Sequence, residues 1–332
     1  MTCFSILDLS PVTQGNTPTE ALRNSLDLIR HAEQWGYERY WVAEHHNMRG
    51  IASAATAVVI GYLASGTSTI RVGAGGIMLP NHAPLVIAEQ FGTLATLYPG
   101  RIDLGLGRAP GTDQVTAMAL RRTLTGNVED FPRDVVELQH YLKDPQPDQR
   151  ITAVPGAGTN VPLWILGSSL FGAQLAGMLG LPFAFASHFA PELLSRAVKV
   201  YRDHFKPSEQ LEAPYLMLGF NVCAADTNDE AHYLRSSSTL SFLNMRKGKP
   251  GLLPPPVREM ENQLSKEDKK ILSATRRCIA VGDVNAVRDG MAEFINEYKA
   301  DELILVSSIY NHSARLHSYE ITMDAAREIN GI

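Results

Sequence analysis

The feature that most constrains the fold is a repeated alternation of short apolar segments with amphipathic segments along the whole chain. The short segments have the length of buried strands, and those that follow carry apolar residues at helical spacing. Strands are predicted at residues 4–9, 40–43, 70–75, 102–106, 161–166, 183–186, 215–223 and 302–306. Such alternation predicts a parallel sheet, so we expect an α/β fold, a (β/α)8 TIM barrel with insertions that forms a single domain over residues 1–332. A doubly wound open sheet is the alternative.

The first predicted helix has clear signals at both ends. Thr17 can cap its amino terminus, Pro18 fits the first turn and Glu20 completes a capping box. Gly36 then ends the helix, because glycine adopts the left-handed conformation of a helix carboxyl cap.

Two segments are longer than a minimal barrel needs. Residues 143–160 are rich in proline, glycine and aspartate, and we expect a connecting insertion there. Residues 245–270 contain four prolines and many charges and are too long for an ordinary connection. We expect this second segment to be an active-site lid over the barrel mouth, with a disordered or uninvolved surface loop as the alternative.

Composition points to a protein that binds small molecules. The net charge of -5 gives no reason to expect nucleic acid or an anionic membrane as a partner. Neither a signal peptide nor an apolar run of about 18 residues is visible, so we expect a cytoplasmic location. Cys3, Cys223 and Cys278 lack paired spacing, and we expect them to be reduced and buried.

The segment Glu44-His45-His46-Asn47 is the strongest candidate for a catalytic site. It directly follows the predicted strand at 40–43, and catalytic groups of barrel enzymes project from the carboxyl ends of strands. A histidine-rich surface turn is the alternative interpretation. Carboxylate and imidazole also suit zinc or iron. Because adjacent side chains of an extended segment point to opposite faces, His45 and His46 do not easily reach one ion, and we expect no metal site.

Two glycine-rich segments, residues 73–78 and 105–110, lack the third glycine of a dinucleotide fingerprint, so no nicotinamide site is expected. Gly75-Gly76 lies at the end of a predicted strand, where paired glycines indicate either a bulge or a flat ligand lying on the main chain. A serine nucleophile is not expected either, because Gly-x-Ser-x-Gly is absent.

Two further features favour an anion site. Arg108 follows the fourth predicted strand between Gly107 and Pro110, although a surface arginine is the simpler interpretation. Gly167-Ser168-Ser169 places hydroxyl and backbone N–H groups at a helix amino terminus, where phosphate binds readily. Plain helix capping by a serine is the alternative there.

Together these segments resemble the bacterial luciferase-like flavin-dependent monooxygenases, in particular their single-chain group. The resemblance rests on Glu44-His45-His46, residues 72–80 followed by His82 and Pro84, residues 100–108, and Leu166-Gly167-Ser168-Ser169, with further similarity at 180–186 and 314–320. Each motif alone is weak, but four in order at predicted strand ends are specific.

The resemblance implies a barrel that binds reduced, diffusible FMN from a separate NAD(P)H-dependent flavin reductase and oxidises a small organic substrate with O2. A non-prolyl cis peptide that supports the flavin ring maps onto Gly75-Gly76, and the catalytic histidine onto His45 beside Glu44. The phosphate contacts map onto Arg108, Gly167, Ser168 and Ser169, with Arg121 or Arg122 as a second arginine. The family's mobile loop falls at 245–270, and a homodimer is expected.

One departure limits this resemblance. The reactive cysteine of luciferase is replaced here by Gly107, so light emission is not implied. Two rival functions are a deazaflavin-dependent dehydrogenase on the same barrel and a flavin-binding protein without turnover.

Overall fold

The computed structural model describes residues 1–109, 111–120, 128–273 and 276–332. Eight parallel strands form a closed ring in which neighbouring strands are hydrogen-bonded. From β1 to β7 the strands follow one another in chain order, and β9 closes the ring because it pairs with both β7 and β1. The ring consists of β1 (Cys3–Asp8), β2 (Arg39–Val42), β3 (Arg71–Met78), β4 (Ile102–Gly107), β5 (Leu163–Gly167), β6 (Phe183–Phe185), β7 (Leu216–Ala224) and β9 (Glu302–Val306). The expected (β/α)8 barrel is confirmed, and the open sheet is wrong.

A ninth strand, β8 (Ile279–Gly282), lies outside this ring. It pairs with β7 from Asn221 to Ala224, whereas β9 pairs with β7 from Met217 to Asn221. β7 therefore pairs with β9 up to Asn221 and with β8 from Asn221 onward. The sequence analysis did not predict β8.

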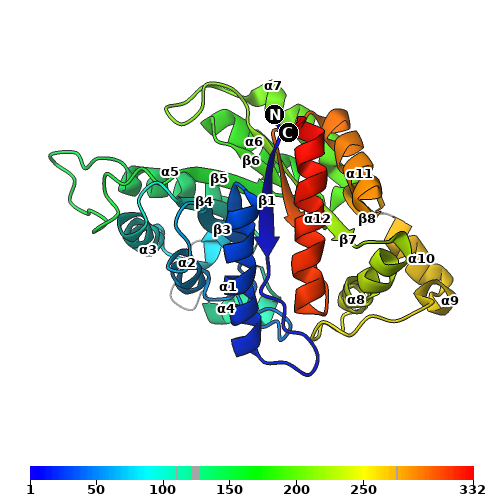
Figure 1. Cartoon of the computed structure of the whole chain (residues 1–332). Coiled ribbons are helices and arrows are strands. Elements are labelled where there is room, and N and C mark those ends of the chain that lie inside the picture. Colours follow the sequence, from blue (N-terminus) through cyan, green and yellow to red (C-terminus); the bar gives the residue numbers. More distant parts are fainter. Residues whose placement is uncertain (110, 121–127, 274–275) are drawn as a thin grey trace.

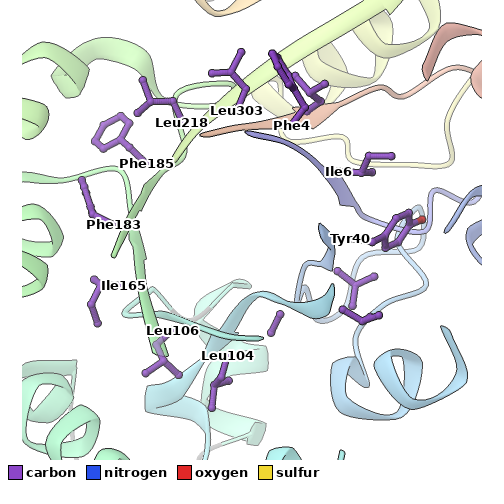
Figure 2. Packing of buried hydrophobic residues seen from close by; sticks show 14 of the residues in the cluster. Phe4, Ile6, Tyr40, Leu104, Leu106, Ile165, Phe183, Phe185, Leu218 and Leu303 are labelled. Atoms are coloured by element: carbon purple, nitrogen blue, oxygen red, sulfur yellow. The ribbon is translucent and has the colours of Figure 1, made fainter. Parts of the chain in front are cut away.

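Helices surround the ring of strands (Figure 1). They are α1 (Pro18–Trp35), α2 (Thr56–Ala64), α3 (Pro84–Leu97), α5 (Phe131–Leu142), α6 (Leu170–Leu179), α7 (Leu194–His204), α11 (Val284–Tyr298) and α12 (His312–Asn330). The predicted capping box of α1 is present, because Thr17 N donates to Glu20 at 2.8 Å and Glu20 N donates to the Thr17 hydroxyl at 3.3 Å. Figure 2 shows labelled side chains such as Phe4, Leu104 and Phe183 pointing away from the ring, toward the helices. The main hydrophobic core thus lies between the strands and the helices.

Four more helices lie at the end of the barrel toward which the β1 arrow points in Figure 1. They are α4 (Gln114–Leu120), α8 (Asn228–Arg246), α9 (Met260–Gln263) and α10 (Lys266–Ser273). Short 3-10 turns occur at η1 (Leu79–Asn81), η2 (Val128–Asp130), η3 (Pro191–Leu193) and η4 (Arg276–Cys278). This end, where the carboxyl ends of the strands lie, is called the mouth below.

The predicted lid at 245–270 is not one continuous loop. It contains the end of α8, the extended residues 247–259, the whole of α9 and part of α10. Residues 247–259, called the strap, bind the loop after β1: Leu253 N donates to Val12 O and Gln14 N donates to Leu253 O, both at 2.9 Å. α9 and α10 were not predicted, because helices of four and eight residues are too short to give a clear periodic pattern. Residues 143–160 contain no helix or strand.

The opposite end of the barrel interior is filled by buried charges, called the basal network. Arg39 donates to Glu302 and to Asp103, each at 2.9 Å, and both carboxylates are fully buried. Tyr215 donates to Glu302 at 2.9 Å, and Trp41 donates to Asp103 at 3.2 Å. Ser5 and Arg71 complete the basal network through Glu302 and Asp103, respectively. An apolar layer next to it includes Leu7, Trp41, Trp164, Met217 and Ile304.

All three cysteines are free thiols. Cys223 and Cys278 are buried, and burial raises the pKa of each thiol to about 12. Cys3 is partly exposed, so the expectation that all three are buried is wrong for Cys3. Among the helices of the described residues, none has the length and apolar character to span a bilayer.

Candidate active site

The Glu44 carboxylate is the polar centre of the mouth. It lies just after β2, its side chain is 1% exposed, and it accepts hydrogen bonds from His46 Nε2 at 2.7 Å, His82 Nε2 at 2.9 Å and Met78 N at 3.1 Å. Burial alone would raise its pKa, but the hydrogen bonds from His82 and His46 outweigh burial and hold that pKa below the ordinary value. Glu44 is therefore an ionised carboxylate that fixes two imidazoles.

His82 was not recognised as a site residue, since it lies 38 residues beyond its partner Glu44. One ligand atom each from Glu44, His46 and His82 lies within 4.8 Å of the others, close enough to bind one metal ion. His45 is not part of this group, because its side chain diverges from that of His46. The argument against a metal site was that His45 and His46 do not easily reach one ion. In the structure the second imidazole beside Glu44 comes from His82 instead of His45.

His45 and His188 each carry a buried Nδ1 atom that has no hydrogen-bond partner among the described residues. Burial lowers the pKa of His45, although the Glu44 charge opposes this effect. His188 follows β6 and packs over Gly219 of β7, where a Cβ atom would lie 2.1 Å from His188 Nδ1. Burial and the neighbouring His45 lower the pKa of His188 to about 4. Both imidazoles are therefore neutral at pH 7. No local motif in the sequence marks His188 as a site residue.

Gly75 and Gly76 are joined by a cis peptide bond near the end of β3, at the position that the resemblance implied. The pairing of β3 with β4 shifts between Ala74 and Ile77, so the bulge, one of the two interpretations of the paired glycines, is present. A Cβ at Gly76 would lie 2.7 Å from Gly105 O, which means that the two backbones pack too closely for a side chain. Gly75 remains partly exposed.

Arg108 and the serine turn meet at one corner of the mouth. The Arg108 guanidinium lies 4.2 Å from the centre of the Phe171 ring in the first turn of α6. Ser169 immediately precedes α6, but its side chain makes no capping hydrogen bond, so the alternative of plain helix capping is wrong. Ser168 is exposed, and Gly167 is the last residue of β5. Arg121 and Arg122 lie outside the described residues.

In (β/α)8 barrel enzymes the chemistry takes place at the carboxyl ends of the strands, and the polar groups of this barrel lie at that end, on the loops after β2 to β6. The profile of the family described as luciferase-like monooxygenase matches residues 2–301. This chain belongs to that family, and it is an oxidoreductase that depends on a flavin or deazaflavin cofactor.

Individual relatives cover nearly the whole chain. A luciferase-like monooxygenase of Escherichia coli is 53% identical over 328 residues, which are 99% of this chain and 98% of that protein. The N-acetyl-S-alkylcysteine monooxygenase of Bacillus subtilis is 33% identical over 331 residues, 97% of each chain. The crystal structure of apo-MsnO8 matches with a TM-score of 0.92 and 35% identity over 98% of this chain and 99% of that one.

More distant neighbours share the fold and differ in cofactor. The oxygenating constituent of 3,6-diketocamphane monooxygenase, solved in complex with FMN, has a TM-score of 0.72 at 17% identity and covers 97% of this chain and 96% of its own. A secondary alcohol dehydrogenase that depends on F420 has a TM-score of 0.67 at 17% identity, with coverages of 98% and 99%. The fold alone therefore does not choose between the two cofactors.

Proposed function

We propose that this protein is an FMN-dependent monooxygenase that uses O2 to oxidise a small organic substrate, with reduced FMN supplied by a separate NAD(P)H-dependent flavin reductase. The observation that carries the proposal is His45, whose buried Nδ1 lies at the mouth of a barrel of this family and has no partner among the residues that the structure describes. Buried polar atoms are rarely left unpaired without a functional reason.

The residues at the mouth fit FMN. Arg108 lacks a carboxylate partner among the described residues and lies beside the amino terminus of α6, so it can pair with a phosphate together with Ser168, Ser169 and the first N–H groups of the helix. The partly exposed backbone at Gly75, next to the cis peptide bond, offers a flat surface for a ring system. Reduced FMN, when bound, supplies the electrons with which O2 is activated.

The protein's own groups then manage protons and orientation. His45 is neutral at pH 7 because its pKa is lowered, so Nδ1 can take up a proton during oxidation and return it afterwards. The ionised Glu44 orients His46 and His82, and the hydrogen bond from Met78 N ties this group to β3. We propose that the strap excludes water from this site as an active-site lid.

The first test is FMN binding by the Arg108→Ala variant. A charge-assisted hydrogen bond contributes about 1.5–3 kcal/mol, so the dissociation constant should rise about 10- to 150-fold. Arg49→Ala, at an exposed arginine after β2, is the matched control and should bind FMN like the wild type. Unchanged affinity in Arg108→Ala would remove the phosphate assignment.

The second test follows product formation with reduced FMN and with a reduced deazaflavin, each in the presence and absence of O2. N-acetyl-S-methylcysteine is a reasonable first compound, since a relative at 33% identity is named for N-acetyl-S-alkylcysteine. Product that requires both FMN and O2 supports the proposal. O2-independent hydride transfer with the deazaflavin would instead identify a dehydrogenase.

We further propose a homodimer. α2 exposes Val58 and Tyr62 one turn apart, and such paired apolar side chains suit a contact between subunits. Mass measurement in solution tests this, and a monomer at micromolar concentration would contradict it.

A further inference from the structure

Arg235 lies on the helix that crosses the mouth next to β7. Along β7 the side chains of Met217, Asn221 and Cys223 share the face that points into the barrel, because Met217 belongs to the interior cluster and side chains alternate. Cys223 Sγ donates to Ala231 O of α8 at 3.3 Å, and Arg235 lies four residues after Ala231, on the same face of α8. Arg235 therefore lies over the inward row of β7, one helical turn beyond Ala231.

The guanidinium of Arg235 is left largely without partners. It donates one hydrogen bond, to Ser238 Oγ at 2.7 Å, although a guanidinium has five N–H donors. Within the described part of the chain, no carboxylate pairs with it. The side chain is only partly accessible to water, and burial lowers the pKa of the guanidinium.

Two other arginines with largely buried side chains, by contrast, are paired with carboxylates. Arg39 contacts Glu302 at 2.9 Å, and Arg315 contacts Asp8 at 2.7 Å. An unpaired charge in a poorly hydrated place is unfavourable, whereas a carboxylate can accept two hydrogen bonds from one guanidinium. Arg235 is thus placed to receive its counter-charge from a ligand.

We infer that Arg235 is the anion-binding residue of the substrate site and that the substrate carries a carboxylate. This inference rests on the proposed function, which locates the oxidation at His45. The flavin phosphate is a poor alternative source of the anion, since Arg108 follows β4 and the ring places β5 and β6 between β4 and β7.

The geometry also indicates the size of the substrate. His188 packs over Gly219, and the first turn of α8, which precedes Arg235, packs over Cys223, four residues further along β7. At about 3.3 Å per residue, the backbone positions of Gly219 and Cys223 are roughly 13 Å apart. The oxidised atom and the carboxylate should therefore be separated by several bonds, as in an extended acid.

The test measures binding without turnover. A panel of straight-chain thioether, ketone and alkyl carboxylic acids of four to ten carbons, each with its primary amide, is titrated by ligand-detected NMR against the full-length protein with oxidised FMN. We expect the best acids to bind at least about 10-fold more tightly than their amides. Arg235→Gln should abolish this preference, and Arg235→Lys should keep part of it.

Three controls make the outcome decisive. Arg246→Gln removes an exposed arginine from the same helix and should keep the preference for acids. Ser238→Ala tests the same site if Arg235→Gln does not fold, and it should weaken the preference only in part. FMN affinity should be unchanged in Arg235→Gln, because a loss there would assign Arg235 to the phosphate.

The inference is overturned if no acid binds, if amides bind equally well, or if Arg246→Gln loses the preference as Arg235→Gln does. Acid binding through Arg235 without O2-dependent product would leave the anion site standing and contradict the proposed function. If the wild type and Arg235→Gln oxidise neutral compounds at equal rates, the proposed function stands and the anion site at Arg235 is contradicted.

Discussion

The two ends of the barrel interior both contain buried polar and charged side chains, but these side chains differ in whether they have partners. At the basal end, Arg39 contacts Asp103 and Glu302 at 2.9 Å, and further donors complete both carboxylates. At the mouth, within the part of the chain that the structure describes, His45 and His188 each have a buried nitrogen without a partner, and Arg235 has one hydroxyl partner.

The contrast separates stability from function within one fold. A satisfied buried network holds the strands in position, whereas unsatisfied polar groups cost stability and persist where a ligand completes them. Changes at the basal network should therefore affect unfolding, and changes at the mouth should affect binding, turnover or pH dependence.

The largest expected effect is at the basal network. Glu302→Ala leaves Arg39 buried without one of its two carboxylates, and breaking such a pair costs about 3–5 kcal/mol. Chemical denaturation should show this loss of stability. Glu209→Ala, which removes an exposed partner of Lys143, is the control and should unfold like the wild type. Equal stability of both variants would break the comparison at its basal end.

The next effect is the pH dependence of stability that arises from His188. Its pKa is about 4 in the folded protein and near 6.5 when unfolded, so the unfolded state binds the proton first as pH falls. The contribution is fully present above pH 6.5 and is lost toward pH 4, by roughly 3 kcal/mol.

His188→Asn should flatten the stability profile between pH 6.5 and 4, as measured by denaturation at several pH values. His317→Asn is the control: hydrogen bonding to Asp226 raises the pKa of this exposed histidine, so both states are protonated in most of that window. A slope that survives in His188→Asn would mean that His188 is not held neutral at the mouth.

A third prediction concerns His45. His45→Ala should fold and bind FMN like the wild type but form product about 100-fold more slowly, the usual contribution of a positioned acid or base. Stopped-flow product analysis measures the rate, and a melting curve checks the fold. Normal turnover would transfer the role to His46 or Glu44, whose variants His46→Ala and Glu44→Gln would then be compared.

The smallest effect should be seen at the strap. Proteases should cleave near Lys247, Lys249 or Arg258 in the free protein, and more slowly when FMN and substrate are bound, because closure orders the segment. Cleavage at the exposed Arg150, in the connecting segment, is the internal control. A strap cut equally fast in both states would be an uninvolved surface segment.

Most of the barrel could be predicted from sequence because its signals are local. The helix Pro18–Trp35 and the strand Glu302–Val306 have the predicted bounds, since capping residues mark the ends of the helix and a change of hydrophobicity marks the ends of the strand. β8 has four residues and α9 is equally short, so neither gives a periodic pattern.

The site could be predicted only where its residues are neighbours in sequence. Glu44 and His45 end a strand signal, and Arg108 lies in a glycine-rich turn. His82, His188 and Arg235 become site residues through contacts with distant elements, which no local pattern reveals. The interpretation of Glu44 also changed, because only the structure identifies its three donors.

The change of strand neighbours along β7 suggests that separate parts of the chain form the substrate side and the flavin side of the mouth, which is useful for protein design. Beyond Asn221, the wall of the barrel continues through β8 and α8 instead of β9, so this side of the mouth is built from the stretch between β7 and β9. The residues proposed for the flavin lie on β2 to β5 and their loops. Replacing residues 225–282 with the equivalent stretch of a relative should therefore exchange the accepted substrates while leaving the cofactor and the oxidation chemistry in place.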